Sequence, residues 1–129
     1  MSSFYFSIQF NFDFSNRVFM KYKIKSRIWI EADDSVFLGE GKVKLLKSLV
    51  HTKSLSKSAK ELKISYKKAW NLIDSVNKSA KTAVVIKNTG GTGGGGTVIT
   101  KHGKELIEIY EKINKNCWKY LDKQLEKYM

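Results

Sequence analysis

The chain has 129 residues, 42% of them hydrophobic, which is enough for one domain with its own core and an accessory element. No apolar run approaches the roughly 18–20 residues that cross a membrane, and no basic segment followed by an apolar one marks a secretory signal, so we expect a protein of the cytoplasm. One cysteine, Cys117, excludes an internal disulfide, and two distant histidines, His51 and His102, suggest no metal site.

The positive charge is concentrated in the middle of the chain. The protein has 24 basic and 12 acidic residues, a net charge of +12. Residues 41–104 contain fourteen lysines but only two acidic residues, Glu61 and Asp74, so the whole excess lies there. This distribution predicts a polyanionic partner, because lysines that neutralise phosphates release condensed counterions. The alternative is a lysine-rich surface without a specific partner.

The N-terminal part predicts β-structure. Residues 4–14, FYFSIQFNFDF, alternate between apolar and mostly polar side chains, which predicts a strand whose apolar face must pair or be covered. A second alternation over residues 20–31 has its isoleucines on one side. Residues 31–39 predict a small β-hairpin that turns at Asp33–Ser35. Residues 1–19 are assigned no function.

The central part predicts three helices. Residues 41–52 have helical periodicity, a short amphipathic segment with Ala59 and Leu62 on its buried side follows Ser56, and Lys63–Ile64 form a tight break. Ser65 is a suitable N-cap for a helix over about 66–80, because its hydroxyl can accept an unpaired backbone N–H. The last two helices and their short turn predict a helix-turn-helix. The apolar face of the first helix is predicted to consist of Val43, Leu46, Leu49 and Val50.

The predicted helix 66–80 has an apolar and a polar side. The buried stripe is predicted to be Tyr66, Ala69, Trp70, Ile73 and Val76. The opposite face presents Lys67, Lys68, Asn71, Ser75 and Lys78. A base-stacking role for the tryptophan is the alternative, but its spacing favours the core.

Six of the nine glycines lie within residues 90–96, between two short β-branched runs. This placement predicts the tip of a β-hairpin, a wing over residues 88–97 that follows the helix-turn-helix. A phosphate-binding loop is the first alternative, since Gly91, Gly93 and Gly96 satisfy G-x-G-x-x-G. That motif needs a helix to begin at its last glycine, and here a strand is predicted instead. A flexible linker is the second alternative.

After Thr100, a plausible N-cap, residues 101–129 predict a long helix whose apolar side chains repeat every three or four positions. Such an apolar seam predicts a coiled-coil-like dimer contact. The alternative is that the helix folds back on its own domain.

Two segments are specific enough to indicate a family. Ser65–Trp70, SYKKAW, and the wing TGGTGGGG followed by Thr100 and Gly103 resemble the N-terminal DNA-binding domain of the ModE family of molybdate-responsive regulators. This domain is a winged helix distantly related to the LysR type, and the resemblance covers about residues 25–112. It implies a dimer, a second helix in the major groove and a wing beside the DNA backbone or minor groove. It also implies that the C-terminal helix joins strands near the N-terminus in the dimer.

Oxyanion sensing is not carried over from the family, because the molybdate-binding C-terminal domains of full-length ModE proteins have no counterpart before Met129. A separate sensor protein, or regulation by other means, remains open. The predicted fold class is α+β: a winged helix-turn-helix with an N-terminal β-hairpin or strand extension and a long C-terminal dimerisation helix. The predicted divisions are 1–22 for the extension, 23–100 for the DNA-binding domain and 101–129 for the dimerisation helix.

The candidate DNA-contacting residues come from the helix-turn-helix and the wing. They are Ser56, Ser58, Ser65, Tyr66, Lys67, Lys68, Asn71, Ser75, Lys87, Thr89, Thr92 and Lys101. Asn71 can pair bidentately with adenine, and the lysines of the helix can meet guanine or phosphate, although a solvated face is an equal alternative. Thr97 is a further phosphate candidate, Ser65 can serve as a cap only, and Asp74 is expected to pair with a nearby lysine.

The sequence therefore predicts a dimeric, sequence-specific transcriptional regulator that binds double-stranded DNA. No catalytic arrangement is discernible, so no enzyme, cofactor or metal is expected. Two alternatives stay open: a sequence-indifferent chromatin or architectural protein, and a small oxyanion- or nucleotide-binding protein that uses the glycine loop.

Overall fold

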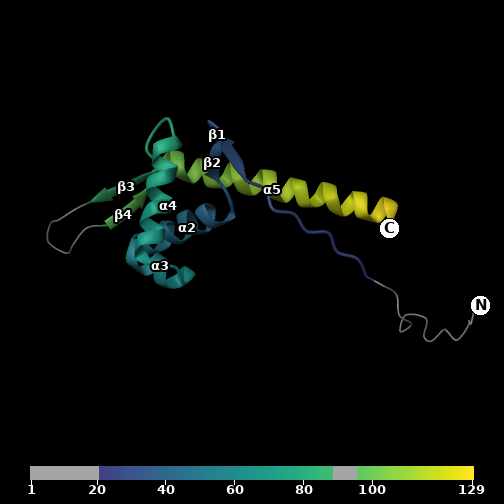
Figure 1. Ribbon diagram of the computed structural model, residues 1–129, viewed down its shortest axis with the longest axis horizontal. Coiled ribbons are helices and arrows are strands. Elements are labelled where there is room, and N and C mark those ends of the chain that lie inside the picture. The colour runs from purple at the N-terminus through teal and green to yellow at the C-terminus, as the bar shows by residue number, and fades with distance from the viewer. Residues whose placement is uncertain (1–20, 89–95) are drawn as a thin grey trace, which may run out of the picture. The chain divides into compact units, whose positions relative to one another are not determined.

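The computed structural model describes residues 21–88 and 96–129 (Figure 1). The predictions for the first strand and for the wing tip, including Thr89 and Thr92, lie outside the described residues. The chain divides into two compact units, and residues 26–119 form the larger one. The smaller unit includes the described residues 21–25 and 120–129. The fold is α+β, as predicted, with four helices and two small antiparallel sheets in the described residues.

The first sheet is a tight hairpin. Strand β1 (Ile30–Ala32) pairs with β2 (Ser35–Leu38), and Ala32 lies opposite Ser35. The two residues between them, Asp33 and Asp34, have φ of 51° and 63°, and a two-residue hairpin turn of this kind needs positive φ at both central positions. The predicted hairpin is confirmed. Of the β-structure that the alternation over residues 20–31 predicted, only β1 is found in the described residues, because residues 21–29 are neither helix nor strand and β1 begins at Ile30.

Three helices follow the hairpin: α2 (Glu40–Thr52), α3 (Leu55–Leu62) and α4 (Tyr66–Ser79). Helix α3 begins one residue before Ser56, because Ser54 caps it by accepting the Lys57 N–H at 3.1 Å. Helices α2 and α3 both end at a lysine in the left-handed conformation, and the second of these lysines, Lys63, opens the turn into α4. Ser65 caps α4 as predicted and accepts the Lys68 N–H at 3.0 Å.

The second sheet is the expected wing. Strand β3 (Val85–Asn88) pairs antiparallel with β4 (Gly96–Ile99). Helix α5 (Lys101–Tyr128) follows directly, and Thr100 caps it by accepting the Gly103 N–H at 3.0 Å. A β-carbon on Gly103 would lie 2.6 Å from the Val84 carbonyl oxygen, so only glycine allows this close approach of helix and strand.

The core of the larger unit lies between α2, α4, the wing and the start of α5 (Figure 1). Helix α2 contributes Leu45, Leu46 and Leu49, all fully buried, while the predicted core residue Val50 is more than one third exposed. The other core contributors are Leu38, Val43, Leu55, Ala59, Ala69, Ile73, Val76, Val84, Val85, Ile99, Ile107 and Tyr110. Across residues 21–88 and 96–129, no helix has an apolar stretch of the length needed to span a membrane.

Candidate nucleic-acid interface

Some of the fourteen lysines of residues 41–104 form ion pairs with carboxylates of the same chain, and others do not. Lys44 pairs with Glu40 at 3.3 Å, Lys47 pairs with Glu111, and Lys78 pairs with Asp74 at 3.0 Å, the last of these as predicted. Nine others form no ion pair with any described residue: Lys53, Lys57, Lys60, Lys63, Lys67, Lys68, Lys81, Lys101 and Lys104.

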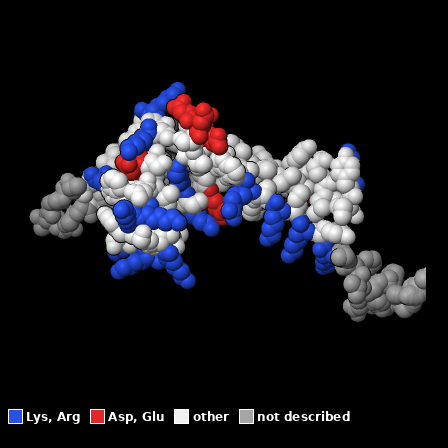
Figure 2. Space-filling model, in the orientation of Figure 1, with Lys and Arg blue, Asp and Glu red and all other residues white. Residues whose placement is uncertain are grey.

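The free lysines and the exposed carboxylates occupy different places. Figure 2 shows basic side chains over α3, while acidic side chains gather at the β1–β2 hairpin, where Glu31, Asp33 and Asp34 are exposed. The uncompensated positive charge therefore belongs to the helix-turn-helix and its surroundings and not to the hairpin.

The outer face of α4 consists of Lys67, Lys68 and Asn71, all exposed. Among the described residues, none provides a hydrogen bond or ion pair to these three side chains. Since they lie within the first two turns of a capped helix, they present donors and an acceptor outward from a rigid element. Ser56 and Ser65 are also exposed, although the Ser65 hydroxyl is occupied by the cap.

Two serines that the sequence predicted as contacts point inward. Ser58 is 0% exposed, and its hydroxyl lies 2.8 Å from that of Ser48 and 2.6 Å from that of Thr52. Ser75 is half-buried and accepts a hydrogen bond from Lys42 Nζ at 2.9 Å. The prediction of Ser58 as a phosphate contact is wrong, because this side of α3 packs on α2. The assignment of Ser75 to an open outer face is wrong for a similar reason, since Lys42 covers it.

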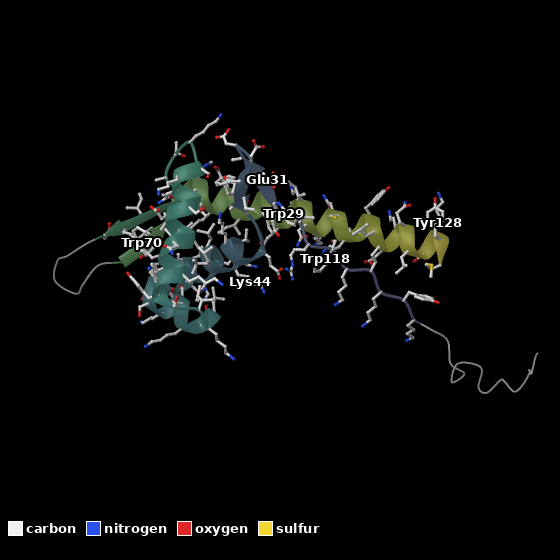
Figure 3. The ribbon with its side chains drawn as sticks, in the orientation of Figure 1. Trp29, Glu31, Lys44, Trp70, Trp118 and Tyr128 are labelled. Atoms are coloured by element: carbon white, nitrogen blue, oxygen red, sulfur yellow. The ribbon has the colours of Figure 1, made fainter. Side chains whose placement is uncertain are left out.

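The two aromatic residues predicted for the buried stripe of α4 are exposed instead. Trp70 is 41% exposed and Tyr66 is 56% exposed. The buried side of α4 centres on Ala69, Ile73 and Val76, so the tryptophan lies at its edge and the tyrosine in the first turn, beyond the packed region. Figure 3 shows Trp70 beside the wing, where Lys87 Nζ lies 4.3 Å from the centre of its ring.

Asn77 joins α4 to the wing, a role that the sequence analysis missed. Its side-chain oxygen accepts the Val84 and Val85 N–H groups at 2.9 and 3.1 Å, and its amide nitrogen donates to the Val85 carbonyl at 2.9 Å. An asparagine at the edge of an amphipathic helix gives no sequence signal for such a bridge, because its partners are set by the tertiary fold. The bridge fixes the start of β3 against α4.

Lys42 joins α4 to the first hairpin and was also missed. Its ammonium group is nearly buried and donates to the Val36 carbonyl at 2.5 Å and to the Ser75 hydroxyl at 2.9 Å. Burial lowers the pKa of this lysine. It is therefore a structural cation and does not add to the exposed basic surface.

The base of the wing is anchored to the helices. Thr97 is buried, and its N–H donates to the Lys53 carbonyl at 3.0 Å, which corrects its proposed phosphate contact. Lys87 and Lys101 are exposed, as a contact role requires. Gly96 begins strand β4, so no helix N-terminus follows the glycines, and the nucleotide-binding fingerprint lacks the element that would hold a pyrophosphate.

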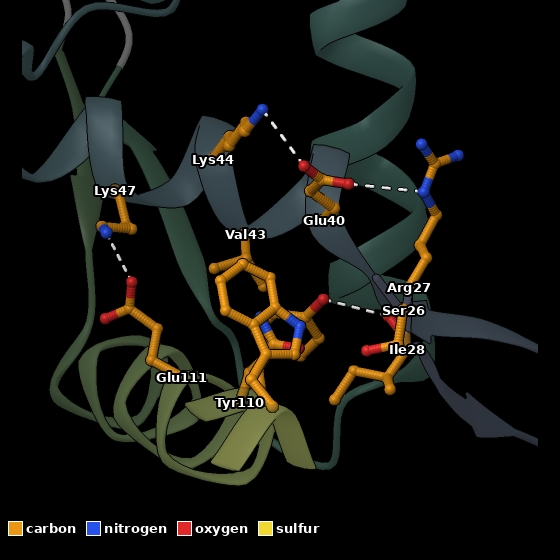
Figure 4. Close-up of a pocket in the computed structure, with 11 residues that line it drawn as sticks. Ser26, Arg27, Ile28, Glu40, Val43, Lys44, Lys47, Tyr110 and Glu111 are labelled. Atoms are coloured by element: carbon orange, nitrogen blue, oxygen red, sulfur yellow. Dashed lines mark hydrogen bonds and ion pairs between the residues drawn. The ribbon is translucent and has the colours of Figure 1, made fainter. Parts of the chain in front are cut away.

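A cavity of about 220 Å³ lies between α2, α5 and residues 26–28 (Figure 4). Tyr110, on its wall, donates to the Ile28 carbonyl at 2.9 Å. Arg27 lies 3.5 Å from Glu40, and the two lysines of the cavity are paired with glutamates as well. Because each cation of its lining has a carboxylate partner, the cavity offers no free positive charge to an oxyanion.

No protein-family model matches the chain. The sequence is 33% identical over 86 residues to the transcriptional regulator ModE of Haemophilus influenzae, covering 67% of this chain and 34% of that protein. It is 37% identical over 84 residues to the DNA-binding transcriptional dual regulator ModE of Escherichia coli K12, covering 65% of this chain and 32% of that protein. The molybdenum transport protein ModE of Azotobacter vinelandii is 29% identical over 102 residues, covering 79% of this chain and 38% of that protein.

These matches confirm the resemblance to ModE-type regulators that the helix and wing motifs indicated. The chain spans about a third of the length of the curated relatives it matches. What those longer proteins do as a whole is therefore not transferred by the similarity alone.

Proposed function

We propose that this chain is a sequence-specific transcriptional regulator that binds double-stranded DNA, on the premise of its similarity to ModE-type regulators over two thirds of its length. In this proposal α4 enters the major groove and the glycine-tipped wing lies along the backbone or minor groove. The major groove of B-DNA admits an α-helix and presents a distinct pattern of donors and acceptors for each base pair.

The observation that carries the proposal is the outer face of α4. Lys67, Lys68 and Asn71 are exposed on a helix that is anchored to the core by other side chains, and no described residue occupies their polar groups. An amide can recognise adenine bidentately and a lysine can donate to guanine, so the three side chains suit base edges as well as phosphates. The unpaired lysines around them supply the sequence-independent attraction.

We further propose that the regulator acts as a homodimer through α5. Ile109 and Ile113 of this helix lie four residues apart on one side and are both about half exposed, and apolar side chains of this size gain free energy when a second helix covers them. A two-fold dimer would read two half-sites separated by about one helical turn, roughly 34–36 Å, or a multiple of it.

The test is selection of binding sequences from a random pool of DNA duplexes by the full chain, followed by titration of the selected duplex by fluorescence anisotropy. A regulator should enrich a pseudo-palindromic motif and bind it at least about 10³-fold more tightly than scrambled duplex at physiological salt. The same titration with Asn71→Ala should lose part of this preference.

Two other outcomes would contradict the proposal. Tight binding without enrichment would support a sequence-indifferent architectural protein, for which the unpaired lysines suffice. Absence of duplex binding, together with heat released on titration with molybdate, tungstate or ATP, would support the anion-binding alternative. These two outcomes differ in the measurement that reports them, so they cannot be confused.

A further inference from the structure

The indole of Trp70 lies where α4 meets the wing. It is 41% exposed, and the ammonium group of Lys87 lies 4.3 Å from the ring centre (Figure 3). This distance is within the range of about 6 Å at which the electron-rich face of a tryptophan attracts a cation. Lys87 is therefore held by a ring from another element, unlike the unpaired lysines of α3 and α4.

The position of Lys87 on the wing explains this contact. Side chains alternate along β3, so Lys87 shares a face with Val85, and Thr97 opposite it belongs to the same face. Both neighbours are buried, whereas Ile86 on the other face is half exposed. Lys87 thus lies on the inner face of the hairpin, two residues beyond the buried Val85, where it contacts the Trp70 ring at the edge of α4.

Trp70 and Asn77 together fix the direction of β3 along α4. They are seven residues apart, which is about two helical turns or roughly 10 Å, so they lie on one side of the helix. Asn77 holds the start of the strand through three hydrogen bonds, and Trp70 meets the lysine near its end. The wing is therefore oriented at two points by the helix that bears Lys67, Lys68 and Asn71.

The nearby carboxylate of Asp74 does not by itself hold the Lys87 ammonium group in place. Burial has the larger effect and lowers the pKa of Lys87, while Asp74, one turn from Trp70, attracts the ammonium and raises that pKa. The carboxylate of Asp74 already pairs with Lys78 at 3.0 Å. No ion pair joins Asp74 to Lys87, so the indole is the group that places this ammonium.

We propose that Trp70 is a positioning residue that holds the Lys87 ammonium in the seam between the outer face of α4 and the wing, ready to meet a DNA phosphate. This inference rests on the proposed function. Holding the long side chain in place before binding reduces the conformational freedom that it loses on the DNA. Trp70 itself makes no contact with a base in this arrangement.

The ring contact is tested without DNA. In NMR spectra of the wild-type chain, the ε-methylene protons of Lys87 should be shifted upfield by the indole ring current, and the shift should disappear in Trp70→Leu. Urea unfolding of Trp70→Leu shows whether the variant is folded, and Trp70→Phe, which keeps an aromatic face, should retain part of the shift. If the Lys87 ε-methylene protons of the wild type show no upfield shift, the proposal is overturned, whatever the DNA-binding measurements give.

The role on DNA is tested by a double-mutant cycle on the selected duplex. Trp70→Leu should weaken binding about two- to fivefold, since an exposed cation–π contact is worth about 0.5–1 kcal/mol and 1.4 kcal/mol is tenfold. Its salt dependence should stay near that of the wild type, because Lys87 is still present. Lys87→Met should lower the slope of log affinity against log salt by about one.

The decisive result is the effect of Trp70→Leu in the Lys87→Met background. If Trp70 acts only by positioning Lys87, its replacement in this background should not weaken DNA binding further. If Trp70 stacks on a base, its replacement should weaken binding by the same factor in both backgrounds, which would overturn the proposal. The matched control is Lys81→Met, another exposed lysine without an ion pair, in which Trp70→Leu should still lose two- to fivefold. A wild type that binds no duplex would overturn the proposed function as well, and a persisting ring-current shift would then show that the contact itself is present.

Discussion

Helices α4 and α5 are both amphipathic, but they leave opposite sides uncovered. The apolar side of α4 is packed by its own domain, with Ala69, Ile73 and Val76 buried, and its charged side is open. In α5 Ile107 and Tyr110 are buried, while Ile109 and Ile113, on another side of the helix, are about half exposed. A helix whose charged side is open suits a charged partner, and a helix whose apolar side is open suits an apolar one.

This difference teaches that one sequence pattern can serve two purposes in the same chain. Periodicity shows that a helix has an apolar side, but the number of elements packed around the helix determines whether that side faces a core or solvent. Helix α4 lies among α2, α3 and the wing, whereas no described residue of α5 after Tyr110 belongs to the hydrophobic core. The two helices should therefore respond differently to the same kind of substitution.

The largest effect is expected for the covered side of α4. Ile73→Ala should lower the free energy of unfolding by about 2–5 kcal/mol, because it removes buried methyl groups and leaves a cavity. Ile86→Ala, at a half-exposed position on the outer face of β3, should change it by less than about 0.5 kcal/mol. Urea titration followed by circular dichroism measures both, and equal losses would mean that α4 is not packed as described.

The open side of α5 should control association. Ile113→Ala should raise the dissociation constant of the dimer by about tenfold or more, since burying an isoleucine side chain is worth about 1.5–3 kcal/mol and 1.4 kcal/mol is tenfold. Lys112→Ala, at an exposed charged position of the same helix, is the control and should leave the constant nearly unchanged. Sedimentation equilibrium measures the constant, and a wild type that stays monomeric would refute the proposed use of this face.

The open side of α4 should separate base reading from phosphate attraction. Asn71→Ala should reduce discrimination at one base pair by about 1–3 kcal/mol and leave other positions unchanged. Lys101→Ala should weaken binding to all duplexes about equally and lower the salt slope by about one. Anisotropy titrations on single-substitution duplexes measure both, and an identical change of specificity in the two variants would contradict the assignment of α4 to base reading.

The smallest effect is expected for the contact of Glu61, on α3, with Ser48 and His51 of α2. Hydrogen bonds from Ser48 and His51 lower the pKa of Glu61 below its usual 4.5. The unfolded chain then binds more protons than the native one in that acidic range, so this contact stabilises the fold above about pH 4.5 and is lost as the pH falls through the lowered pKa.

Glu61→Gln should therefore make the free energy of unfolding depend less on pH below 4.5 than it does in the wild type. Urea titrations at several acidic pH values measure this dependence. Glu105→Gln is a control on α5, where the His102 ring nitrogen lies 3.9 Å from the carboxylate. If the free energy of unfolding depends on pH in the same way in the wild type and in Glu61→Gln, the carboxylate does not stabilise the α2–α3 contact.

The sequence by itself determined most of the described elements and several of their ends. Ser65 and Thr100 were identified as caps, and both accept the N–H of the residue three positions later. The turn at Asp33 and Asp34, the wing strands and the length of α5 were also predictable. The reason is that caps, turns and periodicity depend on groups within about four residues of one another, so the information is local.

Only the tertiary structure decided which side chains were left open. Trp70 was predicted to be buried and is held at the surface beneath Lys87, while Ser58 was predicted to be open and is enclosed against α2. The bridges made by Lys42 and Asn77 were not predictable at all. Each of these outcomes depends on a second element packed at the edge of a helix, and helical spacing specifies the side of a residue but not the neighbour that meets it there.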